Sequence, residues 1–335
     1  MLNREPSDLA YGNHSGHVKL RKTLSEYLYR TRGIVCHEDQ IIITSGVVPG
    51  LFLLIQYFSR LSGSIIVEDP VNNVVRDMLR INGVKTIHHP VDNQGIDPTT
   101  LPMDSEISSI LLTPSHQYPM GGSLSISRRI QLVNYARERN CYIIEDDYDS
   151  DFRYTNSPVE SIHELDPERV IYISSFSKNF IPSLRLGYMV LPTSLVSNIH
   201  YSKRFVNIHS PTFEQLAMEK FISNGYLEQY LNKMKKKYIK RQHVLIKCLK
   251  KSFGKQVEII GGETGLHLVV CFKGVRFTSK LIEKIKGRGV YIVPVSQYSV
   301  FPENHKSQLI LGYGNLDENQ ISEGISIIKS VLKSS

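Results

Sequence analysis

Short apolar runs alternate with amphipathic helical patterns through the first half of the chain. The strand-like runs fall at residues 41–44, 64–68, 84–88, 107–113, 142–146 and 170–174, and helical patterns occupy residues 47–60, 71–82 and 127–140. Parallel strands need long crossover connections, usually helices, whereas antiparallel strands are commonly joined by short turns. The alternation therefore predicts an α/β domain whose mostly parallel sheet is flanked by helices.

The second half of the chain has a different pattern. A long helical stretch with an interruption at Asn224 and Gly225 is followed by short strands and two helices. We expect a large domain over residues 1–210, a connecting helix over 211–252 and a small α+β domain over 253–335. Residues 1–40 contain an amphipathic helix that Gly33 ends, and they are candidates for packing with the small domain.

Composition and charge narrow the class of protein. Forty Lys and Arg against 32 Asp and Glu give a net charge of +8, and much of the excess lies at residues 233–241. Within a helical pattern such a run favours a solvated helix face over nucleic-acid contact. The four cysteines lack the paired spacing of a metal site. His88 and His89 are adjacent, so in a strand they point to opposite faces and cannot chelate one ion. No apolar run approaches the roughly eighteen residues that a membrane span needs. We expect a cytoplasmic protein with reduced cysteines, no metal site and no membrane segment.

Polar residues follow several of the expected strands. His116 and Gln117 follow one strand, Asp146 and Tyr148 lie at the end of another, and residues 175–178 follow a third. Ligands of open α/β sheets bind beyond the carboxyl ends of the strands, so these side chains are expected at one crevice. The turn after residues 41–44 leads into a helix, where the backbone amides of Gly46 and Val47 are placed to hold an anion.

These residue types suit pyridoxal phosphate. Asp146 and Tyr148 are two apart and share a face of the strand, where the carboxylate would keep a pyridine nitrogen protonated and the phenol would bond the ring oxygen. Lys178, partly desolvated and with a lowered pKa, would form the Schiff base. Phosphate contacts are expected from Ser175, Ser177 and Arg185. Asp149 and Asp151 are interpreted as a solvated turn after the strand.

Five segments carry a resemblance to a known family. They are VEDP, YGNHSGHVKLRKTLSEYLYRTRGI, TPSHQYPMGG, IIEDDYDSDFRY and VIYISSFSKNFIPSLRLGYMVLP. Together they resemble the fold-type I, aminotransferase-like domain of MocR-type regulators, a GntR subfamily in which this domain is fused to a winged-helix DNA-binding domain. The resemblance covers nearly the whole chain. It assigns the Schiff base to Lys178, the ring contacts to Asp146 and Tyr148, the phosphate to Ser175, Ser177 and Arg185, and a place near the ring to His116 and Gln117.

The sequence departs from this family pattern at several points. Only about ten residues precede the YGNHSG block, so the winged helix and the first piece of the small domain are expected to be missing, and any DNA contact would be made through that missing part. Asn72 stands where relatives often have a ring-stacking tyrosine, and Val47, Val48 and Pro49 replace a polar turn. Asn315 and Gln297 replace the arginine that clamps a substrate carboxylate in aminotransferases, which leaves Arg76 as a weak substitute.

Three hypotheses follow. In the first, the chain is a cofactor-binding, effector-sensing and dimerisation domain, a homodimer whose effector is a small amino compound or amino acid. The second is a free-standing aminotransferase that moves an amino group between an amino acid and a 2-oxo acid through Lys178. The third is a remnant that no longer binds cofactor. The missing arginine clamp favours the first over the second, because substrate orientation depends on such a clamp.

Overall fold

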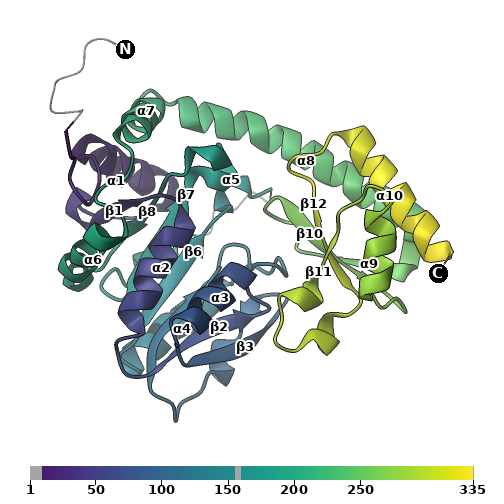
Figure 1. Ribbon diagram of the computed structural model, residues 1–335, viewed down its shortest axis with the longest axis horizontal. Helices are drawn as coiled ribbons and strands as arrows, with labels where there is room; N and C mark the ends of the chain where they lie inside the picture. Colours follow the sequence, from purple (N-terminus) through teal and green to yellow (C-terminus); the bar gives the residue numbers. More distant parts are fainter. Residues whose placement is uncertain (1–9, 155–159, 335) are drawn as a thin grey trace.

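The computed structural model describes residues 10–154 and 160–334, and its largest element is an eight-stranded sheet (Figure 1). The strand order is β1-β8-β7-β6-β5-β2-β3-β4. The bounds are β1 Ile41–Thr44, β2 Ser64–Asp69, β3 Thr86–Asp92, β4 Gly95–Ile96, β5 Ile107–Leu112, β6 Tyr142–Asp147, β7 Val170–Ser175 and β8 Gly187–Val190. The central strands β7, β6, β5, β2 and β3 run parallel, whereas β8, β1 and β4 pair antiparallel with their neighbours. The predicted mostly parallel sheet is confirmed.

Helices cover the sheet through residues that alternate along each strand. Ile42 of β1 packs in one apolar core with α2 (Val47–Phe58), α3 (Asn73–Ile81) and α6 (Thr193–Val206). Ile41 and Ile43 point to the opposite face and pack with α1 (Val18–Arg32). A third core lies under α4 (Ile126–Glu138). This period of two is what a sheet buried on both faces requires.

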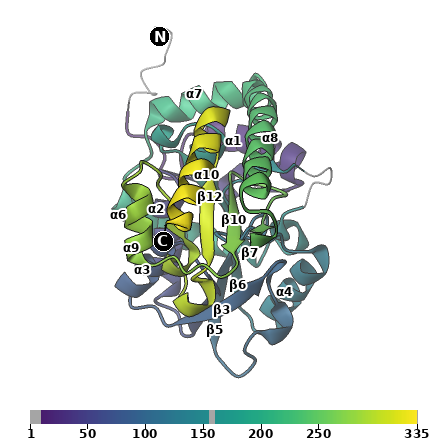
Figure 2. The same cartoon turned by 90° about the vertical axis from the view of Figure 1, so that its right-hand side faces the viewer.

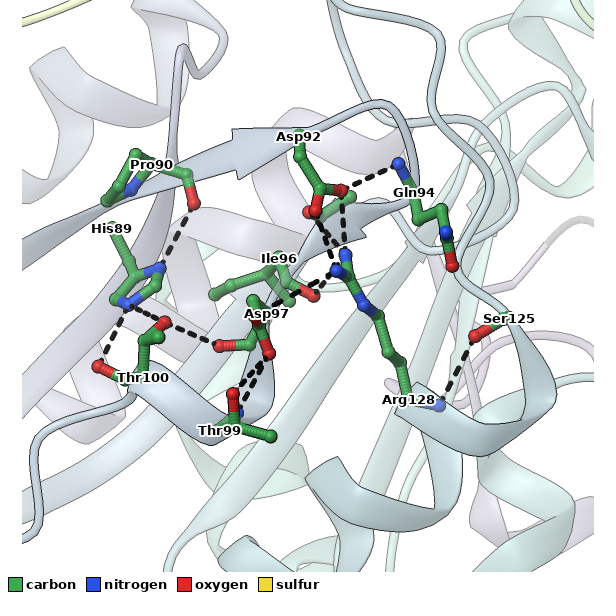
Figure 3. Close-up of polar contacts among 11 residues, drawn as sticks. His89, Pro90, Asp92, Gln94, Ile96, Asp97, Thr99, Thr100, Ser125 and Arg128 are labelled. Carbon is green, nitrogen blue, oxygen red and sulfur yellow. Dashed lines mark hydrogen bonds and ion pairs between the residues drawn. The ribbon is translucent and has the colours of Figure 1, made fainter.

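Strand β3 differs clearly from its expected bounds. β3 begins at Thr86 and extends to Asp92, beyond the predicted end at His88, because β4 folds back on it as a hairpin. Arg128 of α4 holds this hairpin (Figure 3). Its two terminal nitrogens lie 2.7 and 2.6 Å from the two carboxylate oxygens of Asp92, and it also donates to the backbone oxygens of Gly95 and Ile96. Arg128, which lies 36 positions from Asp92 in the sequence, therefore stabilises the end of strand β3, which the local sequence supports only weakly.

The second half of the chain forms a smaller sheet and the helices that cover it. α7 (Thr212–Ser223) and α8 (Tyr226–Phe253) are separated at Asn224 and Gly225, as expected, and α8 runs from the large sheet to the small one (Figure 1). The small sheet has the order β11-β12-β10-β9, with bounds β9 Val257–Ile260, β10 His267–Phe272, β11 Val293–Pro294 and β12 Gln308–Gly312. Strand β11 is short and pairs antiparallel with β12.

Two helices complete this part. α9 (Ser279–Lys286) and α10 (Glu318–Lys333) are capped by Thr278 and Asp317, and α10 lies beside α8 over the small sheet (Figure 2). Within the described residues, no helix is both long and apolar enough to cross a membrane.

The N-terminal helix α1 ends as its sequence predicts. Gly33 adopts a left-handed conformation with φ 73°, and its backbone N–H bonds to the carbonyl of Tyr29. Leu20, Leu24 and Leu28 are fully buried in a core that also contains residues of α8 and the small sheet. The core that α1 enters is therefore continuous from the edge of the large sheet to the small one.

Candidate functional site

The expected site residues gather at the carboxyl ends of the parallel strands. β6 carries Asp146 and is followed by Tyr148, β5 leads into the loop of His116, and β7 leads into α5 (Phe176–Asn179), the short helix that contains Lys178. Because β5, β6 and β7 are neighbours in the sheet, the three loops emerge at one edge.

Asp146 is half-buried, and one of its carboxylate oxygens is buried without a protein partner. Its Oδ1 makes no hydrogen bond. Burial, together with the nearby carboxylates of Asp147, Asp149 and Glu68, raises the pKa of Asp146 to about 8. A buried acceptor without a donor is costly, so the side chain is suited to a ligand that brings a proton or a positive charge. Asp147 points elsewhere, to the hydroxyl of Tyr172 at 2.6 Å.

Tyr148 and His116 contact each other, and a third residue joins them. The Tyr148 hydroxyl lies 2.9 Å from Nδ1 of His116, and Oδ2 of Asp149 lies 2.8 Å from the same nitrogen. Asp149 is buried, so its interpretation as a solvated turn residue is wrong. The carboxylate avoids solvent because it has an imidazole partner and because the small domain covers it, neither of which its local sequence shows.

Lys178 is exposed in the single chain, which contradicts the expected partial desolvation of this lysine. The turn that carries it is nevertheless fixed. Asn179 donates to Oδ2 of Asp151 at 2.8 Å, and Arg32 reaches Oδ1 of the same carboxylate at 2.9 Å. Asp151 is thus also not a solvated turn residue; its side chain is mostly buried in an ion pair that tertiary contacts create.

Two of the expected phosphate residues, Gly46 and Arg185, lie together at the start of α2. Gly46 precedes this helix with φ 102°, and a Cβ built on it would lie 2.8 Å from Nη2 of Arg185. Arg185 itself donates to the backbone oxygen of Ser45 at 3.0 Å, so a guanidinium group and the N–H groups of a helix start lie together. Ser175 caps α5 by accepting from the N–H of Ser177. Helix starts of this kind bind anions, and arginine binds phosphate bidentately.

The small domain contributes groups that the sequence reasoning missed. Gly265 stands so close to the pair that a Cβ would lie 2.3 Å from Nδ1 of His116 and 2.5 Å from Oδ2 of Asp149. His267 packs against His116, with ring centroids 4.8 Å apart and the rings tilted, and it donates to the backbone oxygen of Pro119. Burial and the neighbouring His116 lower the pKa of His267 to about 3, so its ring is neutral. No local signal marks these residues, since about 150 positions separate them from His116.

The donor atoms of His116, Asp149 and His267 lie within 4.8 Å of one another, close enough for a metal site to be considered. Hydrogen bonds already engage Nδ1 of His116, Oδ2 of Asp149 and Nε2 of His267 with protein groups. The arrangement is therefore that of an internal hydrogen-bond cluster. The sequence prediction of no metal stays a prediction.

Three other sequence candidates have mainly structural roles. Gln117 bridges two loops by donating to the backbone oxygens of Pro70 and Tyr118 and accepting from the N–H of Met120. Asn72 caps α3. Arg76 donates to the backbone oxygen of Gln297 at 3.2 Å, which places one cation against the small domain, whereas Asn315 is exposed.

Glu68 is a buried carboxylate that the sequence analysis did not select. The backbone N–H and hydroxyl of Thr113 donate to it at 2.9 and 2.8 Å. Burial still raises its pKa to about 7. It therefore belongs to the acidic surroundings of Asp146.

The fold and this set of strand ends define a fold-type I architecture, which comparisons with known proteins confirm. The sequence matches the aminotransferase class I and II family over residues 2–328. A kynurenine aminotransferase from Pyrococcus horikoshii has a similar structure, with a TM-score of 0.90 and 26% identity over 98% of this chain and 83% of that one.

Regulators are the more similar relatives in sequence. The HTH-type transcriptional regulator YdeL of Bacillus subtilis is 37% identical, and the probable rhizopine catabolism regulatory protein MocR of Rhizobium meliloti is 31% identical, each over 96% of this chain. The chain spans 69% and 65% of these two relatives. It belongs to the aminotransferase class I and II family and, within it, to the aminotransferase-like domains of MocR-type regulators in the GntR family.

The cofactor of this family is pyridoxal 5′-phosphate, and the residues present fit it. Oδ1 of Asp146 has no protein partner and needs a proton from a ligand, while Gly46 and Arg185 supply N–H groups for a phosphate. When bound, this cofactor supplies an electron sink that stabilises negative charge on an attached amino compound.

Proposed function

We propose that this chain binds pyridoxal 5′-phosphate through Lys178 and uses the site to sense a small amino compound, as the effector-binding and dimerisation domain of a MocR-type regulator. Asp146 would pair with the ring nitrogen, Tyr148 and His116 would lie along the ring oxygen side, and Gly46, Val47, Ser175, Ser177 and Arg185 would hold the phosphate. DNA contact would be made through a winged-helix domain of the kind that relatives carry.

The proposal rests on a contrast between the residues expected to bind the cofactor and those expected to bind a substrate carboxylate. The residues expected to hold the cofactor include the half-buried Asp146, with one buried and unpartnered oxygen, and a helix start beside Arg185. In the other half, the position expected for the carboxylate clamp holds the exposed Asn315. A site that binds an amino compound but does not orient it for reaction favours recognition of that compound over its catalytic turnover.

A homodimer is part of this proposal, and an apolar surface supports it. Tyr11, Tyr201, Phe205 and Ile208 are all more than half exposed. They lie on one surface, because His14 contacts both the backbone oxygen of Ile208 and the ring of His200, and Tyr11 meets the ring of His209 edge to face. Exposed apolar patches of this kind mark protein interfaces, and a second copy is the partner that the fold-type I resemblance implies.

An aminotransferase is the second candidate. Arg76 supports it, because its side chain lies between α3 and residue Gln297 of the small domain, where a cation can meet a substrate carboxylate. The four cysteines are free, consistent with either function in a reducing cytoplasm.

The test is the visible absorbance of the purified chain with pyridoxal phosphate. We expect a band that is absent from Lys178→Ala and present in Lys247→Ala, a control at an exposed lysine of α8. Amino acids and amines are then screened. Spectral change without an oxo-acid product supports the sensor, and stoichiometric oxo-acid product supports the aminotransferase. A wild-type chain that acquires no band contradicts both.

A further inference from the structure

One nitrogen atom in the candidate site has two hydrogen-bonding neighbours. Nδ1 of His116 lies 2.8 Å from Oδ2 of Asp149 and 2.9 Å from the Tyr148 hydroxyl. A ring nitrogen of histidine has one in-plane position, which holds either a hydrogen or a lone pair. It can therefore form one full hydrogen bond, and the two neighbours compete for it.

The carboxyl group of Asp149 forms the hydrogen bond with Nδ1 in either of its protonation states. If its carboxyl group is ionised, Nδ1–H donates to it; if it carries a proton, its O–H donates to the lone pair of Nδ1. In both cases Nδ1 cannot accept the hydrogen of Tyr148. The phenol of Tyr148 thus keeps its O–H free to donate elsewhere.

The small domain holds Asp149 and His116 in this arrangement. The backbone of Gly265 lies against both side chains, and the backbone N–H of Gly265 donates to the carbonyl of Phe152 at 2.9 Å. The hydroxyls of Tyr154 and Tyr313 each donate to the Gly265 carbonyl at 2.6 Å. Residues of both domains therefore hold Gly265 in place, and its backbone shields Asp149 and His116 from solvent.

We propose that Asp149 is a positioning residue that acts through His116: by engaging Nδ1, it keeps the Tyr148 hydroxyl hydrogen available for the ring oxygen of the cofactor. This inference rests on the proposed cofactor site. Without Asp149, Nδ1 is free to take the Tyr148 hydrogen, and the ring oxygen loses a donor.

The readout is the pH midpoint of the visible band of the bound cofactor. A donor to the ring oxygen stabilises its negative charge most when the attached Lys178 nitrogen has lost its hydrogen, so losing the donor raises the midpoint. We expect Tyr148→Phe to raise it by about one pH unit or more, the equivalent of one hydrogen bond to a charged group. Among the described residues, the other titratable groups that face this cluster are Glu68, Tyr118, Asp146, Asp147, Tyr154, Lys178, His267 and Tyr313.

Four variants separate a positioning role from a merely structural one. Asp149→Ala should raise the midpoint toward the value of Tyr148→Phe, and Asp149→Asn should restore it, because an amide still engages Nδ1. Asp149→Ala combined with His116→Phe should also return toward the wild-type midpoint, since no nitrogen remains to take the hydrogen. If Asp149→Ala does not fold, Asp149→Asn and His116→Phe still test the inference, because a midpoint raised in either variant as far as in Tyr148→Phe overturns it.

The outcomes also separate this inference from the proposed function. A band that requires Lys178, with equal midpoints in wild type, Tyr148→Phe and Asp149→Ala, overturns the inference and leaves the cofactor site standing. An upward shift in His116→Phe as large as that in Asp149→Ala overturns it as well, because a packing effect would then be sufficient. A band that persists in Lys178→Ala removes the basis of both.

Discussion

Arg32, the last residue of α1, pairs with Asp151, which lies 119 positions further along the chain. Its Nη2 is 2.9 Å from Oδ1 of Asp151, and its Nε is 3.2 Å from Oδ2 of Asp147. The other oxygen of Asp151 accepts from Asn179, the residue after Lys178. The N-terminal helix therefore helps to fix the turn that presents the lysine.

Removing this arginine should destabilise the protein. Arg32→Met keeps the apolar stem but leaves two mostly buried carboxylates without their cation, which costs about 3 kcal/mol in the free energy of unfolding. Arg30→Met is the matched control, because Arg30 lies in the same turn and pairs with Glu228 at the surface, where a loss of about 0.5 kcal/mol is expected. Urea unfolding measures both. Equal losses would contradict a special role for Arg32.

Two glycines of the small domain should respond differently to alanine. Gly265 and Gly274 have similar positive φ angles, 80° and 77°, but a Cβ at Gly265 would lie 2.1 Å from Cε1 of His116, whereas nothing lies within 4 Å of one at Gly274. Gly274→Ala should therefore cost about 1 kcal/mol for backbone strain alone. Gly265→Ala should cost about 1–3 kcal/mol more through overpacking. A comparison of urea unfolding curves tests the difference, which would be absent if the domains did not meet at Gly265.

The stability of the cofactor-free protein should fall as the pH rises. Burial and neighbouring carboxylates raise the pKa of Asp146 to about 8, so the folded state binds a proton that the unfolded chain releases near pH 4. Stability from this group is fully present below pH 4 and is lost between about pH 4 and pH 8, with a slope of up to about 1.4 kcal/mol per pH unit.

Asp146→Asn tests this dependence by urea unfolding across the pH range. The variant should have a shallower slope and a larger free energy of unfolding than wild type at pH 8, with a residual slope from Glu68, whose pKa is about 7. Asp104→Asn, at an exposed aspartate, should leave the curve unchanged. If the wild-type free energy of unfolding instead rises with pH through this window, the expected contribution of Asp146 is contradicted.

Phe205 should matter for the proposed dimer. Its side chain is 74% exposed in the single chain and lies in the apolar surface around Tyr201. Phe205→Asp places a charge in that surface and should shift the protein from dimer to monomer in sedimentation experiments at micromolar concentration. Tyr291→Asp alters a side chain of the small domain that is 80% exposed, and it should leave the mass unchanged. A wild-type monomer would contradict the dimer itself.

Much of the fold follows from the sequence alone. The continuous apolar runs of β2, β5, β6 and β7 predict buried parallel strands, because only a strand covered on both faces needs them. The glycine stop of α1 and the Asp317 cap of α10 are equally local. Lys178, Asp146 and Arg185 were selected because their residue types and strand-end positions suit a phosphorylated cofactor.

Only the tertiary structure decided which charges are buried and what they meet. The local sequence around Asp149 and Asp151 is polar and indicates a solvated turn, yet one carboxylate meets His116 under Gly265 and the other meets Arg32. The exposed side chain of Lys178 was misjudged for the same reason. Periodicity along a chain reports which face of an element is apolar, whereas the solvation of a polar group depends on partners that come from distant parts of the chain and are brought together only by folding.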